Sequence, residues 1–145
     1  MGVFLNSKLP YEQYKSSKTT KYYVDKSELL VELFDSIGTE SPYICITRPR
    51  RFGKSVAANM IAAFFGKGAE AEHLFCDLAV KKNEDYKKHL NSHNVIYIDF
   101  SIEPECCSSY HSYIMRILDG IKTELWEEYS ELSLKQVQSL WDILA

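Results

Sequence analysis

Apolar residues occur along this chain in two patterns, one typical of helices and one typical of strands. Spacings of three and four residues predict helices after Asp25, over residues 108–129 and from residue 133 onward. The apolar run at residues 43–47 is typical of a strand buried in a parallel sheet, and residues 95–100, four apolar residues followed by Asp99 and Phe100, predict a second strand. The mixture predicts an α/β fold in which helices flank a parallel sheet.

The sequence also predicts where the first helix begins and ends, and what kind of segment precedes it. Residues 1–22 are polar and rich in Lys, Ser, Thr and Tyr, which predicts an extended polar arm with little core of its own. The main domain is then expected over residues 23–145. Asp25 and Glu28 form a D-x-x-E capping box at its first helix, and Gly38 is the expected C-terminal cap.

The predicted sheet is small for the helices around it. Two strands alone do not make a stable parallel sheet. The helical pattern after residue 133 also runs to the last residue without a Gly or Pro stop signal. The sequence therefore predicts the N-terminal part of a larger domain, or a chain that forms a homo-oligomer to complete its core.

Positive charge is concentrated between the first predicted strand and a helix-forming run at residues 56–65. A strand, a tight loop and a helix, with Gly-Lys-Ser at the junction, are the context that a phosphate-binding P-loop requires. The expected fold class is therefore a P-loop NTPase-type parallel sheet, and the expected ligand is a nucleotide. The predicted nucleotide-binding residues are Arg48, Pro49, Arg50, Arg51, Phe52, Gly53, Lys54, Ser55 and Val56.

The residue types at this junction suit phosphate chemistry. Amide groups at a helix N-terminus carry partial positive charge and can surround a phosphate. Gly53 lets backbone approach the ligand, Lys54 reaches the β- and γ-phosphates, and Ser55 ligates Mg²⁺. Arg50 and Arg51 have two interpretations. They act with Lys54 as catalytic cations on the γ-phosphate, or they stiffen the loop and pair with acids elsewhere.

The loop departs from the usual G-x-x-x-x-G-K-[ST] spacing, because Arg48 stands where the first glycine is expected. Pro49 fixes one φ angle and supplies the bend in this interpretation.

Two further sets of residues could bind a metal. Asp99 follows an apolar run, as a Walker B acid does, so it either serves the Mg²⁺ or caps and turns the chain at a strand end. Phe100 occupies the position where such hydrolases often have a glutamate base. His89 and His93 have the spacing of a zinc pair on a helix, but the residues between them are weak helix formers, so solvated surface histidines are expected.

Three stretches together resemble the bacterial AAA-ATPase-like family. They are Thr-Arg-Pro-Arg-Arg-Phe-Gly-Lys-Ser at residues 47–55, Tyr-Val-Asp-Lys-Ser at residues 23–27 and Val-Ile-Tyr-Ile-Asp-Phe-Ser at residues 95–101. The resemblance spans residues 3–145. It implies that the domain binds ATP and Mg²⁺, and that the full-length protein is an ATPase whose Walker B strand lies beyond this region.

The same resemblance bears on two other features. It places the stretch around Asp25 beside the nucleotide, whereas helix capping alone also explains an aspartate there. Family members often end in a PD-(D/E)XK nuclease-like domain, so nucleic acid is a partner only by this analogy. A non-hydrolysing, nucleotide-gated switch module is the alternative function, because no residue that could orient water is evident.

Composition narrows the class of protein. The chain has 145 residues, is 46% hydrophobic and carries a net charge of −3, so no overall basic field attracts nucleic acid. Its four cysteines form no CxxC pair, and no secretory signal is present, which predicts reduced thiols in a cytoplasmic protein. The longest apolar run is too short to span a membrane.

Overall fold

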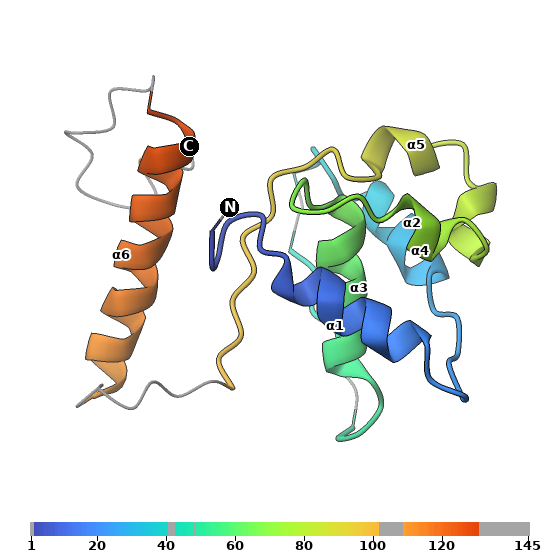
Figure 1. The fold of residues 1–145 in the computed structure, drawn as a ribbon, viewed down its shortest axis with the longest axis horizontal. Coiled ribbons are helices and arrows are strands. Elements are labelled where there is room, and N and C mark those ends of the chain that lie inside the picture. The colour runs from blue at the N-terminus through green and yellow to red at the C-terminus, as the bar shows by residue number, and fades with distance from the viewer. Residues whose placement is uncertain (1, 41–42, 48, 102–108, 131–145) are drawn as a thin grey trace.

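The computed structural model describes residues 2–40, 43–47, 49–101 and 109–130. Its elements are α1 (Leu9–Lys18), α2 (Glu28–Phe34), α3 (Lys54–Phe65), α4 (Glu72–Phe75), the 3-10 helix η1 (Ala79–Lys82), α5 (Tyr86–His89) and α6 (Tyr110–Glu128). Helices α1 to α5 gather into one group, and α6 lies apart from them (Figure 1). The chain that follows α5 and the first residues of the protein run between α6 and this group (Figure 1).

The predicted parallel sheet is wrong for the part of the chain that the structure describes. There the only strand-like pairings are two isolated bridges, Leu5 with Ile96 and Gly66 with His93. Residues 43–47 are exposed and pair with no strand in this part of the chain, and Tyr43 is 92% exposed. An apolar run becomes a buried strand only when neighbouring strands cover it, and the run itself does not specify those neighbours.

The second predicted strand pairs with the N-terminus instead of a sheet. The Asn6 amide donates to the Val95 carbonyl at 2.8 Å, and the Tyr97 amide donates to the Phe4 carbonyl at 3.0 Å. The bridge between Leu5 and Ile96 is antiparallel. The first residues of the chain therefore pair with a segment far along the sequence, and the apolar residues Phe4 and Leu5 lie within the stretch that was expected to be a polar arm.

The expected extended arm also differs from the structure, because residues 9–18 form α1. Pro10 opens this helix, where a missing N–H is tolerated. Tyr14 is fully buried, and α1 packs along α3. Most other positions of α1 are charged or polar, and two of these polar residues also bind other segments: Lys18 donates to the Leu74 carbonyl, and Gln13 accepts from Asn59.

An aromatic core surrounds the C-terminal half of α3. Phe64 is fully buried, and its ring centroid lies 5.1 Å from that of Phe75 and 5.7 Å from that of Phe34. Tyr14 stacks on Phe75 with centroids 5.2 Å apart, which joins α1 to the same core. Residues 56–65 are thus helical as predicted, and their apolar side chains hold α1, α2 and α4 in place.

A smaller core joins the N-terminus to α6. The helix predicted over residues 108–129 is confirmed, and Ser109 caps it by accepting from the Ser112 amide. Ile117, Ile121 and Leu125 pack against Leu5. The Glu124 carboxylate accepts hydrogen bonds from the amides of Val3, Phe4 and Leu5 at 2.6–2.9 Å.

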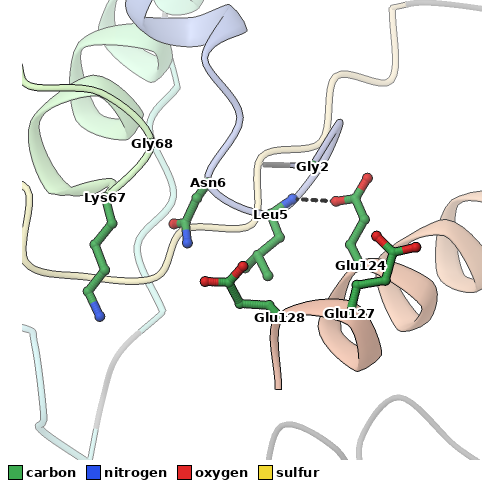
Figure 2. Close-up of a pocket in the computed structure, with 8 residues that line it drawn as sticks. All are labelled: Gly2, Leu5, Asn6, Lys67, Gly68, Glu124, Glu127 and Glu128. Atoms are coloured by element: carbon green, nitrogen blue, oxygen red, sulfur yellow. Dashed lines mark hydrogen bonds between the residues drawn. The ribbon is translucent and has the colours of Figure 1, made fainter. Parts of the chain in front are cut away.

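Figure 2 shows the bond between Glu124 and Leu5 beside a cavity of about 360 Å³, whose other carboxylates are Glu127 and Glu128. Because Glu124 accepts three amides, it anchors the chain and is not available to a ligand in this cavity. The helix predicted after residue 133 lies outside the described residues, and so do Cys106 and Cys107.

Candidate functional site

A sharp turn joins the basic loop to α3. Gly53 is the N-cap residue with a φ of +76°, and Lys54 is the first residue of the helix. Arg51 also has a positive φ of +67°. The Ala57 amide donates to the Gly53 carbonyl at 2.9 Å, the first bond of the helical ladder. The loop-to-helix junction expected at Gly-Lys-Ser is therefore present, although the segment before the loop is not a strand.

Two lysine ammonium groups contact the backbone of this loop. Lys54 Nζ donates to the Pro49 carbonyl at 3.4 Å, and Lys26 Nζ donates to the Phe52 carbonyl at 3.3 Å. A Cβ added to Gly53 would lie 3.5 Å from Lys26 Nζ. This is an ordinary contact distance, so a side chain at residue 53 would be disfavoured by the left-handed backbone and not by crowding.

The two sequence neighbours of Lys26, Asp25 and Ser27, are each held by hydrogen bonds. Asp25 accepts from the Ser27 amide and, through its other oxygen, from the Ala79 amide, each at 2.8 Å. The Ser27 hydroxyl accepts from the Val80 amide at 3.1 Å, and Ser27 is fully buried. Asp25 and Ser27 together therefore bind the start of η1, and we call this pair of residues the η1 clamp.

The η1 clamp corrects the capping box expected from Asp25 and Glu28. Ser27 occupies the N-cap position of α2, and no side chain caps that helix end. Partial burial raises the pKa of the Asp25 carboxyl, but the hydrogen bonds from Ala79 and Ser27 outweigh this effect, and the pKa is lowered overall. Asp25 is thus an ionised acceptor that ties two distant segments together. It does not cap its own helix.

A cavity of about 400 Å³ lies beside the loop. Its walls come from the C-terminal half of α1, from residues 20–26, from residues 51–53 and from the first two turns of α3. Tyr14 and Tyr23 meet in one wall, with their hydroxyl oxygens 2.7 Å apart. Burial raises the pKa of Tyr14, which keeps this phenol protonated. The structure thus joins the stretch at residues 23–27 and the basic loop around one concave surface.

The comparisons with known proteins identify a family for most of the chain. A family model described as predicted AAA-ATPase matches residues 11–144. The chain belongs to this AAA-ATPase-like family. No curated protein and no solved structure matches it.

Most residues predicted for the nucleotide site are among those that the structure describes, and they form the loop and the first turn of α3. Pro49, Arg50 and Ser55 are exposed, and Val56 is half-buried and lines the cavity. Among the described residues, no ion pair involves Arg50 or Arg51, so the acid partners considered for them are not found there. Arg48 lies outside the described residues.

Lys26 is not among the residues predicted for the nucleotide site, although the family resemblance implies that its stretch lies beside the nucleotide. It lies in the Tyr-Val-Asp-Lys-Ser stretch, in which the sequence predicts a capping role for Asp25 because an aspartate before a helix is a common cap. Its contact with the Phe52 carbonyl depends on bringing together positions 26 residues apart. Helical spacing and motif matching do not report such a contact.

Asp99 is not brought to the loop. Its carboxylate accepts from the Ser101 amide at 2.8 Å and from the Ser101 hydroxyl at 2.6 Å, and these bonds lower its pKa. Asp99 lines a separate cavity together with Tyr97 and residues of α6. Asp99 therefore closes a local turn with Ser101, and it does not line the cavity beside the loop.

The two histidines also differ from expectation. His89 is only 4% exposed and stacks on Phe34 with ring centroids 4.7 Å apart, so it is a core residue. Its Nδ1 lies 2.9 Å from His93 Nε2. Among the described residues, no three His, Cys, Asp or Glu side chains are grouped to hold a metal ion. Nor does any helix in the described ranges have the length and apolar character needed to cross a membrane.

Proposed function

We propose that this chain binds ATP together with Mg²⁺, and that the loop at residues 48–55 holds the phosphates. The observation that carries the proposal is the geometry at Gly53. Its left-handed backbone turns the loop directly into α3, a helix of 12 residues, while Lys54 and Lys26 bring ammonium groups to the loop from two different segments. Both the helix end and the cations favour a polyanion.

The lysine contacts are of a kind that phosphate can replace. Distances of 3.3 and 3.4 Å from ammonium to carbonyl are at the long end for hydrogen bonds. A phosphate oxygen carries negative charge, so a bond from an ammonium to it is shorter, at about 2.7–2.9 Å, and adds the attraction between opposite charges. A bound triphosphate therefore offers both lysines better acceptors than the carbonyls they contact.

Mg²⁺ fits the residues at the same place. Ser55 is exposed in the first turn of α3, next to Lys54. Mg²⁺ is usually held by one or two protein oxygen ligands together with phosphate oxygens and water. The Ser55 hydroxyl would supply such a ligand, and the ion would neutralise charge on the phosphates.

A second candidate function, a switch that binds nucleotide without hydrolysing it, is favoured by a specific observation. None of the described residues that line the cavity beside the loop is acidic, and Asp99 lines a different cavity. Hydrolysis needs a group that positions the attacking water. Hydrolysis would therefore depend on residues of the full-length protein outside the described ones, and an attached nucleic-acid-processing domain remains a hypothesis from the family resemblance.

The test is calorimetric titration of the chain with ATP in the presence of Mg²⁺. Lys54→Ala should weaken binding by about 1.5–3 kcal/mol, the value of a charge-assisted hydrogen bond. Lys67→Ala is the matched control, because Lys67 is exposed and lines the cavity of Figure 2, away from the loop. Equal affinities for ATP in the Lys54 variant and the control would refute the proposal.

A further inference from the structure

The cavity beside the loop is built from apolar and aromatic surface next to concentrated positive charge. Arg51 and Lys26 lie in its wall together with Phe52, Tyr22 and Val24. A nucleotide has two matching parts: a flat ring system that suits the apolar surface, and a polyanionic tail that suits the positive charge. We propose that this cavity holds the base and ribose of the nucleotide, with weak discrimination between bases; this inference rests on the proposed phosphate site.

The size and position of the cavity suit a nucleoside. Its volume of about 400 Å³ lies within the range of roughly 300–1,000 Å³ that is usual for small-molecule sites. The residues of the loop that line it, 51–53, directly precede Lys54. A ligand whose phosphates lie at the start of α3 therefore has the open side of the cavity within reach of its sugar and base.

The walls offer contacts that favour a flat ring. Tyr22 is 83% exposed and Phe52 is 57% exposed, although both are large and apolar. Val56 and Met60 of α3 line the cavity from the helix side. Exposed aromatic side chains next to a cavity gain from stacking on a base, which is worth about 1–3 kcal/mol per base.

Four of the hydroxyl groups in the same walls already make hydrogen bonds within the protein. The Ser17 hydroxyl donates to the Gln13 carbonyl at 2.9 Å, and the Thr20 hydroxyl donates to the Ser17 carbonyl at 2.8 Å. The hydroxyls of Tyr14 and Tyr23 bind each other. Strong discrimination between ligands requires protein groups that hydrogen-bond only the correct one. This cavity recognises a ring by its shape and its apolar faces, so ATP and GTP should bind with affinities within about tenfold of each other.

The experiment compares three probes on the same chain, namely ATP, GTP and inorganic tripolyphosphate, each titrated with Mg²⁺ present. Tripolyphosphate reaches only the loop, so the two nucleotides should bind at least roughly tenfold more tightly than it does. Tyr22→Ala should weaken both nucleotides by about tenfold and leave tripolyphosphate unchanged. Tyr43→Ala is the matched control, because Tyr43 is 92% exposed and does not line the cavity.

A second variant tests the cavity from its helical wall. Ala57 is half-buried in α3 and lines the cavity, so Ala57→Leu fills space while leaving the helix intact. It should weaken the nucleotides at least several-fold and leave tripolyphosphate binding unchanged.

The outcomes separate the two proposals. If Lys54→Ala weakens all three probes but nucleotides bind no better than tripolyphosphate, the phosphate site stands and the nucleoside cavity is refuted. A preference for ATP over GTP of a hundredfold or more would refute the weak discrimination between bases. If the unaltered chain binds none of the probes, both proposals fail.

Discussion

The η1 clamp gives the sharpest test of how the structure is held together, because one hydroxyl can be removed from it. The Ser27 hydroxyl accepts the Val80 amide at 3.1 Å, and both residues are 0% exposed. Ser27→Ala leaves that amide buried without an acceptor. The cost of such an orphaned group is about 1–3 kcal/mol.

The burial of both partners places the expected loss near the middle of this range. Water cannot replace the hydroxyl at a fully buried amide, and an alanine methyl group fits where the Ser27 side chain lies. We expect the free energy of unfolding to fall by about 2 kcal/mol, which lowers the melting temperature by roughly 4–8 °C in a protein of this size.

The assay is urea unfolding of the two proteins, followed by circular dichroism, together with hydrogen exchange of the Val80 amide. The hydrogen of that amide should exchange with solvent faster in the variant, because its exchange rate reports how readily the structure around it opens. Ser92→Ala is the matched control: its hydroxyl donates to the Lys88 carbonyl at the surface, and such changes stay within about 0.5 kcal/mol. A Ser27 variant as stable as this control would show that Val80 does not depend on the hydroxyl, and the reasoning would be refuted.

Two further predictions concern catalysis and pH. The isolated chain should hydrolyse ATP negligibly, because Asp99 is held by Ser101 away from the loop; phosphate release near roughly 1 s⁻¹ that disappears in Asp99→Asn would contradict this. Burial lowers the pKa of both His89 and His93, so below about pH 6.5 the unfolded chain binds more protons than the folded one. The free energy of unfolding should therefore fall as the pH drops from 7 to 5, and urea titrations that give the same value across this range would count against a buried neutral pair.

Sequence patterns succeeded where the signal is local. The helix-forming run after Gly53 and the stripe that includes Ile117, Ile121 and Leu125 both form the helices they predict. Each turn of such a helix is stabilised within its own segment and by one apolar face, so periodicity carries the information needed.

The patterns failed where the outcome depends on a distant partner. Residues 43–47 have the composition of a buried strand, yet no described segment pairs with them. Asp25 satisfies the spacing of a capping box, but its carboxylate accepts an amide 54 positions away. In the same way α1 is held by partners distant in sequence, because Tyr14 stacks on Phe75 and Lys18 donates to the Leu74 carbonyl.

The backbone at Arg51 places two opposing demands on one residue. A left-handed φ of +67° costs about 1–2 kcal/mol in a residue with a Cβ, and glycine would avoid that strain, partly offset by its greater freedom in the unfolded chain. Glycine, however, carries no charge to the loop. Selection for thermal stability alone should therefore replace Arg51, whereas selection for retention of a polyanion should keep it. If the proposed phosphate site is correct, Arg51 is a position where resistance to heat has been exchanged for attraction to a ligand.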